Sequence, residues 1–182
     1  MVRDRPGVAG ALLVGGASTR FGSPKALARY EGETLAERAH RVLAEAFGDV
    51  LVVGKAADGL ELPFDVVDDG SDVRASMVGV AAALRLAQAE VVVVLPTDMP
   101  LVTTDLLVEL ADAAEGADAA VPQTGALPGA YRRSALPVLE RRIELGDLAM
   151  HRALRELRVN VVELDEARLR NVNEPGDLPQ EP

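Results

Sequence analysis

Residues 8–25 read VAGALLVGGASTRFGSPK, an apolar run that passes at once into a loop of glycines, hydroxyl side chains and two cations. The apolar part, Val8 to Val14, predicts a buried strand. In the loop, glycine permits positive φ angles and a close approach of the main chain to a ligand. A concave run of backbone N–H groups binds anions such as phosphate, and Arg20 and Lys25 would add positive charge there. The stretch therefore predicts a strand followed by a phosphate-binding loop.

The spacing of the glycines differs from that of two well-known phosphate loops. A Walker loop places lysine directly after its last glycine, whereas two residues separate Gly22 from Lys25. A dinucleotide-binding fingerprint needs G-x-G-x-x-G, and here Gly15 and Gly16 are adjacent. The pattern that remains is G-G-x-S-x-R-x-G-x-x-K. The alternative, a glycine-rich strand-to-helix turn with solvated cations, is the weaker interpretation because so many offsets match at once.

Strands alternate with helices along the chain. Apolar and β-branched runs predict strands at 8–14, 50–53, 64–67, 91–95, 119–121 and 159–164. Capping signals and helical spacing predict helices from Thr34 to Gly48, over 77–87 and 105–115, from Ser134 to Gly146 and from Asp147 to about Leu157. This alternation predicts an α/β fold over residues 1–182, a single-domain, Rossmann-like three-layer sandwich with a mostly parallel sheet. We expect flexible ends at 1–6 and 179–182, and a loop at 123–128.

The composition limits the classes of partner. Apolar residues make up 48% of the 182 residues, an ordinary value for one globular domain. The net charge is −10, from 19 Lys and Arg against 29 Asp and Glu, which disfavours binding to nucleic acid or anionic membranes. Aromatic residues are only 3%, which argues against stacking platforms for single-stranded nucleic acid. An anionic substrate would therefore need a local basic pocket, and the first loop offers one.

Cysteine is absent, which excludes disulfides, zinc–thiolate sites and a thiol nucleophile. Residues 1–7 carry charges and a proline but no apolar stretch typical of a signal peptide. The apolar runs are too short to span a bilayer. We therefore expect a cytoplasmic protein.

Three candidate groups follow predicted strands, and ligands of open α/β sheets bind outside the carboxyl ends of the strands. They are the glycine loop, Asp69 and Asp98. Asp98 stands between Pro96 and Pro100 at the end of the run 91–95, where a carboxylate is unfavourable unless it is paired or metal-bound. Magnesium takes one or two carboxylates together with substrate phosphates, so Asp98 is the candidate metal ligand. The alternative, a cap for the helix at 105–115, is weaker because Asp98 lies too far upstream.

Asn171 and Asn173 flank Val172 in a polar segment, and at period two their side chains would project to the same side. An amide oxygen can bind a hard cation or a substrate hydroxyl. Ordinary Asx-turn chemistry explains the pattern equally well, so the spacing alone leaves both interpretations open.

The loop pattern resembles the signature of the nucleotidyltransferase superfamily, in particular of the molybdenum cofactor guanylyltransferases. The similarity covers nearly the whole chain and is greatest at 13–25, 96–101 and 171–178, where NVNEPGDL resembles the closing motif of that family. It implies a fold of the nucleotide-diphospho-sugar transferase type. Gly15 and Gly16, where cytidylyl relatives tend to have Ala-Gly, favour guanine over cytosine.

The residues and the resemblance together imply individual roles. Residues expected to bind the nucleotide are Leu13, Val14, Gly15, Gly16, Ser18, Lys25, Asp69 and Asp98. Those expected to act in catalysis are Arg20, Lys25 and Asp98. Magnesium is assigned to Asp98 and, more weakly, to Asn173, and the acceptor is assigned to Asn171 and Asn173.

The chain departs from the family pattern at several positions. The family usually has Gly-Pro-Leu-x-Gly where this chain has residues 75–79, reading ASMVG. Asparagine is common at the position of Gly54, and methionine at that of Phe21. The segment 127–131, expected near the second substrate, matches only loosely.

These features predict a magnesium-dependent nucleotidyltransferase. An acceptor phosphate would attack the α-phosphorus of a nucleoside triphosphate, with GTP favoured, and release pyrophosphate. The resemblance implies molybdopterin as the phosphorylated small-molecule acceptor, and transient contacts with proteins that make or receive the cofactor. Two alternatives remain open. One is a cytidylyl- or sugar-phosphate nucleotidyltransferase on the same fold, and the other is a non-catalytic nucleotide-binding module, which the altered segment 76–79 would suit.

Overall fold

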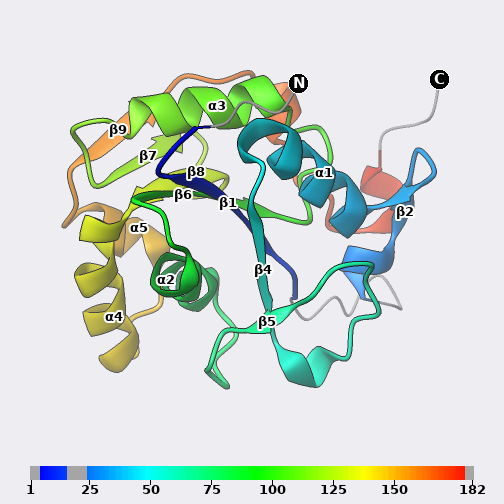
Figure 1. Ribbon diagram of the computed structural model, residues 1–182, viewed down its shortest axis with the longest axis horizontal. Coiled ribbons are helices and arrows are strands. Elements are labelled where there is room, and N and C mark those ends of the chain that lie inside the picture. The colour runs from blue at the N-terminus through cyan, green and yellow to red at the C-terminus, as the bar shows by residue number, and fades with distance from the viewer. Residues whose placement is uncertain (1–4, 16–23, 179–182) are drawn as a thin grey trace.

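The computed structural model describes residues 5–15 and 24–178. Its main sheet has seven strands in the order β5-β4-β1-β6-β8-β7-β9 (Figure 1). Their bounds are β1 Val8–Leu13, β4 Val50–Gly54, β5 Val67–Asp68, β6 Val91–Pro96, β7 Ala119–Pro122, β8 Gly129–Arg132 and β9 Val159–Val162. Strand β8 runs antiparallel to both of its neighbours, and the other pairs are parallel. The predicted mostly parallel sheet is confirmed.

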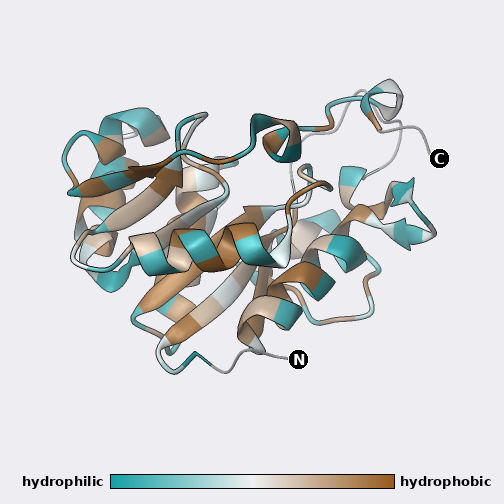
Figure 2. Ribbon diagram, turned by 90° about the horizontal axis from the view of Figure 1, so that it is seen from above, coloured by the Kyte–Doolittle hydropathy of each residue, from teal (hydrophilic) through white to brown (hydrophobic). Residues whose placement is uncertain are grey.

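Helices cover both faces of this sheet (Figure 1). On one face lie α1 Leu35–Phe47 and α3 Thr104–Ala113, whose buried residues form one hydrophobic core with the sheet. On the other face lie α2 Ser76–Leu86, α4 Leu136–Glu144 and α5 Met150–Leu154, which contribute to a second core. The apolar strands lie between these layers (Figure 2). The three-layer sandwich predicted from the alternation of elements is therefore confirmed.

Shorter elements complete the described part of the chain. A two-stranded hairpin consists of β2 Arg29–Tyr30 and β3 Glu33–Thr34. The 3₁₀ turns are η1 Lys25–Leu27, η2 Ala56–Asp58, η3 Arg133–Ala135, η4 Glu166–Leu169 and η5 Pro175–Asp177.

The predicted capping box of α1 is present. The Thr34 side chain accepts a hydrogen bond from the backbone N–H of Glu37 at 3.1 Å, and the Glu37 carboxylate accepts one from the N–H of Thr34 at 2.8 Å. These two bonds satisfy N–H groups that a helix start leaves without partners. Gly48 ends the helix with φ of 78°, as its position predicts.

The predicted third strand is wrong in extent. Only Val67 and Asp68 pair with β4, whereas the expected strand began at Phe64. The ring of Phe64 stacks on His40 of α1, with 4.4 Å between ring centroids, so this residue packs on a helix. Pro63 precedes it and has no N–H to donate to a ladder.

The sequence predicted neither strand β8 nor the correct first residues of α4 and α5. Ser134 does not cap a helix, because its hydroxyl donates to Asp118 at 2.6 Å and α4 begins only at Leu136. Asp147 is not the N-cap of α5, since Ala149 occupies that position and the Asp147 carboxylate pairs with Arg142 and Arg152. Strand β8 was missed because four residues with a glycine carry little periodicity.

Of the ends predicted to be flexible, 1–6 and 179–182, residues 1–4 and 179–182 lie outside the described residues, so this prediction stays open. Arg5 is tied to Asp112 of α3 by a hydrogen bond of 3.2 Å. Among the helices that the structure describes, none combines the length and the apolar character needed to cross a bilayer.

Candidate active site

A cleft of about 1080 Å³ opens at the carboxyl ends of the parallel strands. Residues that follow β1, β4, β5 and β6 line it, as expected for an open α/β sheet. Because β1 lies between β4 and β6, the segments after these strands meet at one edge of the sheet. The cleft is therefore built where the sequence placed the nucleotide.

Most of the predicted site residues come together in this cleft. Its lining includes Leu13, Val14, Gly15, Lys25, Asp69, Asp98 and Asn171. Asn173 joins them through its contact with Lys25. Three further predicted residues, Gly16, Ser18 and Arg20, lie outside the described residues, so their roles stay predictions.

The charged cluster of the cleft consists of Lys25, Asp98 and Asn173. The Lys25 ammonium lies 3.3 Å from Oδ2 of Asp98 and 3.5 Å from Oδ1 of Asn173. Both distances exceed the usual length of a charge-assisted hydrogen bond. The backbone N–H of Val172 also donates to the Asp98 carbonyl at 2.7 Å, which fastens the segment of both asparagines to the Asp98 loop.

The surroundings of Asp98 fit a cation ligand. Its Oδ1 atom is buried, and no residue in the described part of the chain donates a hydrogen bond to it. A buried carboxylate oxygen without a partner is unfavourable, and a bound cation would compensate it. The alternative role as a helix cap is wrong, because Thr103 occupies the N-cap of α3.

The donor set also fits magnesium rather than a site made wholly of protein ligands. Within 5–15 and 24–178, no three or more His, Asp or Glu side chains gather in a way that could hold a metal. Magnesium commonly takes one or two carboxylates and completes its shell with water and substrate phosphates. Asp98 and the amide oxygen of Asn173 are the side chains that would hold it.

Asp69 is held by Lys55, a residue that the sequence pattern did not single out. Lys55 donates to the Asp69 carboxylate at 2.7 Å, and both side chains are nearly buried. The same ammonium donates to the carbonyls of Ser71 and Val73, and the N–H of Ser71 donates to Asp69 at 3.0 Å. Lys55 directly follows the predicted second strand, and that position could have identified it. It fixes the loop that carries Asp69.

An ion pair of Asp58 and Arg74 lines the same cleft and was also missed. The Arg74 guanidinium donates to both carboxylate oxygens and holds the pKa of Asp58 below its usual range. Gly15 is next to this pair, since a Cβ there would lie 3.3 Å from Oδ2 of Asp58, and its φ is 125°. The positive φ and this close approach explain why glycine begins the loop.

One departure from the family pattern, at Gly54, and one glycine that matches it, Gly79, have steric explanations. A Cβ on Gly54 would lie 2.6 Å from the carbonyl oxygen of Val14, so asparagine does not fit the backbone found here. A Cβ on Gly79 would lie 3.0 Å from the Leu13 side chain, so the glycine lets α2 pack closely on β1. In the loosely matching segment, Leu127 lines the cleft, whereas Tyr131 is buried and donates to the carbonyl of Ala126 at 2.6 Å.

Known proteins share this architecture and sequence. A probable molybdenum cofactor guanylyltransferase of Opitutus terrae is 34% identical, covering 100% of this chain and 98% of its own. A molybdenum cofactor guanylyltransferase of Pseudomonas putida is 32% identical over 92% of this chain and 93% of its own. The crystal structure of the molybdopterin-guanine dinucleotide biosynthesis protein A of Archaeoglobus fulgidus has a TM-score of 0.78 at 28% identity, covering 93% and 94%.

The family model of the MobA-like NTP transferase domain matches residues 10–161. That range contains Lys25, Asp69 and Asp98 and the rest of the cleft lining apart from Asn171. This chain belongs to the MobA-like NTP transferase family and is a nucleotidyltransferase.

Proposed function

We propose that the protein is a magnesium-dependent guanylyltransferase that moves GMP from GTP onto molybdopterin or a closely related phosphorylated acceptor. The observation that carries the proposal is the convergence of Lys25, Asp98 and Asn173 at the cleft where the glycine loop begins. The names of the relatives from Opitutus terrae and Pseudomonas putida support the choice of guanine and of the acceptor.

In the proposed reaction, an oxygen of the acceptor phosphate forms a bond to the α-phosphorus of GTP. The bond from that phosphorus to the oxygen bridging the β-phosphorus breaks, and pyrophosphate leaves with the electron pair. Such a displacement depends on in-line positioning and on neutralised charge rather than on a covalent protein intermediate. The protein therefore has to bind the two substrates, orient them for in-line attack and neutralise the charge of the phosphates.

Lys25 supplies mobile positive charge in this scheme. Its contacts with Asp98 and Asn173 are longer than the usual charge-assisted hydrogen bond, and phosphate oxygens would offer the ammonium stronger acceptors. Lysine acts at such sites as a compact point charge. Arg20 is the second cation of the loop, and its role rests on the sequence pattern alone.

Asp98 and Asn173 are the residues that would hold magnesium. When bound there, magnesium would neutralise phosphate charge and favour the departure of pyrophosphate. Asp69 would contact the nucleotide from the other side of β1, where Lys55 keeps its carboxylate fixed. Asn171, which lines the cleft, would meet the acceptor.

The test is pyrophosphate release by the purified protein with each of the four nucleoside triphosphates and magnesium, with and without molybdopterin. The proposal expects release with GTP only when the acceptor is present, and abolition by chelation of magnesium. Preference for CTP would support the cytidylyl alternative instead. Nucleotide binding without turnover on any acceptor would support a non-catalytic module.

A further inference from the structure

The loop that carries Asp98 is fastened at two points by other parts of the chain. One is the hydrogen bond from the N–H of Val172 to the Asp98 carbonyl. The other comes from α1, where Nε of Arg38 donates to the carbonyl of Pro100 at 2.8 Å. Pro100 is buried and lies two residues after Asp98. The second fastening therefore acts directly on the backbone next to the proposed metal ligand.

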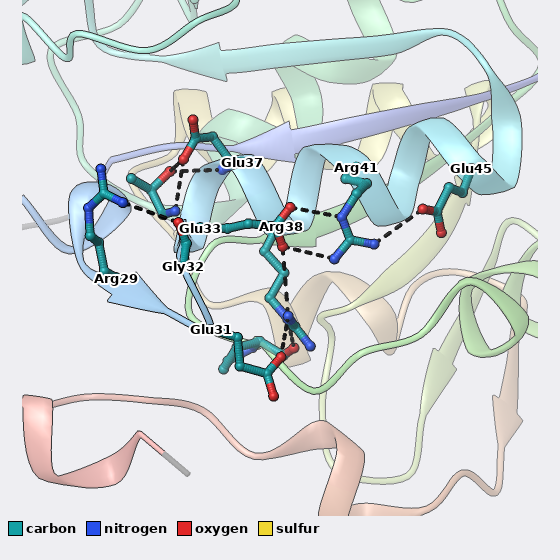
Figure 3. Close-up of polar contacts among 10 residues, drawn as sticks. Arg29, Glu31, Gly32, Glu33, Glu37, Arg38, Arg41 and Glu45 are labelled. Carbon is teal, nitrogen blue, oxygen red and sulfur yellow. Dashed lines mark hydrogen bonds and ion pairs between the residues drawn. The ribbon is translucent and has the colours of Figure 1, made fainter. Parts of the chain in front are cut away.

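The same guanidinium also fastens the segment that carries Lys25. Its Nη1 atom donates to Glu31 in the β2–β3 hairpin at 2.7 Å. The guanidinium carbon lies 5.0 Å from the centre of the Tyr30 ring, in cation–π range, and Tyr30 is buried. Tyr30 follows η1, the turn that begins with Lys25, by three residues. Figure 3 shows Arg38 reaching from α1 toward Glu31, away from Arg41 and Glu45.

We infer that Arg38 is a positioning residue that sets the distance between Lys25 and Asp98. It contacts neither of them, and it acts by holding both of their segments against α1. Its side chain is only 20% exposed, so its contacts are sheltered from water. A displacement of about 1 Å at reacting groups can lower turnover on the order of 10²-fold. Holding these two segments in place therefore matters for the rate.

Arg41 offers a matched control one turn further along the same helix. It donates twice to Glu33 at 2.9 Å and once to Glu45 at 3.2 Å (Figure 3). None of these bonds involves the Asp98 loop. Arg41→Met therefore removes an arginine and several charged contacts from α1, while the bond to Pro100 stays intact.

The first experiment compares steady-state kinetics of Arg38→Met, Arg38→Lys and Arg41→Met, and this part rests on the proposed function. For Arg38→Met we expect kcat to fall roughly tenfold or more with little change in KM for the nucleotide, since orientation rather than binding is lost. The magnesium concentration for half-maximal rate should rise. Arg38→Lys, which can still donate to Pro100, should recover part of kcat, and Arg41→Met should match the parent protein.

The second experiment needs no activity and therefore stands apart from the proposed function. Amide hydrogen exchange of the ligand-free protein reports local opening. In Arg38→Met the amides of Ala28, Val102 and Val172, which close the two segments, should exchange on the order of tenfold faster. The amide of Val93 in β6 should keep its rate, and Arg41→Met, whose bonds reach the hairpin but not the Asp98 loop, should leave the exchange of Val102 and Val172 unchanged.

Several results would overturn the inference. Parent-like exchange at Val102 and Val172 in Arg38→Met would show that Arg38 does not hold the Asp98 loop in place. Equal acceleration at Val93 would show a general loss of stability instead. A loss of kcat in Arg41→Met as large as that in Arg38→Met would also remove the special role. If Arg38→Met does not fold, Arg38→Lys should show a smaller acceleration of exchange at Val102 and Val172, and no acceleration there would contradict the inference.

Discussion

The ammonium of Lys25 lies 3.3 Å from Oδ2 of Asp98, although the two residues are 73 positions apart in the chain. Their side chains are 16% and 25% exposed, so the pair lies in a partly desolvated part of the cleft. Each member partly neutralises the other. In the proposed reaction a cation at Asp98 and phosphate at Lys25 would replace this mutual contact, and the two residues can be tested separately.

Replacing Lys25 tests the cationic side of the pair. In Lys25→Ala we expect turnover to fall on the order of 10²-fold or more, because a positioned charge no longer meets the triphosphate. The fold should persist, since the contacts of the ammonium with Asp98 and Asn173 are long. Pyrophosphate release measures the first effect and the circular dichroism spectrum the second. Turnover near that of the parent protein would contradict the proposed role.

Replacing Asp98 tests the metal side. Asp98→Asn keeps the shape and removes the charge, so activity should collapse and magnesium should no longer tighten nucleotide binding. Without metal, thermal stability should stay equal or fall, because the variant removes the ion pair with Lys25 and leaves an amide atom at the buried, unpartnered position. Titration of nucleotide with and without magnesium decides the matter. Magnesium enhancement as large as in the parent protein would mean that Asp98 is not the ligand.

Local patterns sufficed for much of the fold. The run 91–95 predicts a buried parallel strand because it is continuously apolar, and it forms β6. The capping box at Thr34 and Glu37 locates the start of α1 because both of its hydrogen bonds are local. Ser134 and Asp147 failed as caps because distant charged partners compete for their side chains, and no local pattern contains those partners.

In the candidate site, too, some residues can be found from local patterns and others only from tertiary contacts. The location of Lys25, Asp69 and Asp98 in the cleft was predictable because each lies in a segment that follows a strand, at the edge where ligands bind. The partners of Lys55 and Arg74 could not be assigned from the sequence, because their ion pairs with Asp69 and Asp58 form only in the folded chain. Arg38 was not predictable, since its partner at Pro100 is 62 residues away.

The acid stability of the protein should depend on Asp118. Hydrogen bonds from Arg158, then from the Ser134 hydroxyl and the Arg158 backbone, hold the pKa of Asp118 well below its usual range. A carboxyl with a lowered folded-state pKa stabilises the fold above its unfolded pKa of about 3.9, and this stability is lost as the pH falls toward the folded value. Melting temperatures of the parent protein should therefore drop steeply below about pH 4.

The comparison of Asp118→Asn with Asp112→Asn isolates this effect. Asp118→Asn should be less stable than the parent at pH 7, and the gap should narrow as the pH falls through the acid range. The side chain of Asp112 pairs with Arg5 but is 62% exposed. Asp112→Asn should therefore change stability little, both at pH 7 and in the acid range. A constant gap between Asp118→Asn and the parent from pH 7 to pH 2 would assign the loss to something other than the carboxylate charge.

Replacing Gly54 with asparagine, the residue expected at this position in the family, should destabilise the protein. A Cβ there would lie 2.6 Å from the Val14 carbonyl oxygen and 2.8 Å from its Cγ2 atom, so Gly54→Ala and Gly54→Asn both require a shift of β1 against β4. Overpacking of this kind costs about 1–3 kcal/mol of unfolding free energy. Because Val14 leads into Gly15, nucleotide affinity should fall as well.

Denaturant unfolding of Gly54→Ala measures the cost, and two further variants locate its origin. Gly176→Ala should be nearly neutral, since a Cβ at Gly176 meets nothing within 4 Å. Adding Val14→Ala to Gly54→Ala removes the contact with Cγ2 but leaves the one with the carbonyl oxygen. The double variant should therefore recover none of the stability lost in Gly54→Ala, because backbone atoms make the shorter contact. Full recovery would mean that side-chain packing alone excludes larger residues, and that another chain with a smaller residue at position 14 could carry asparagine at position 54.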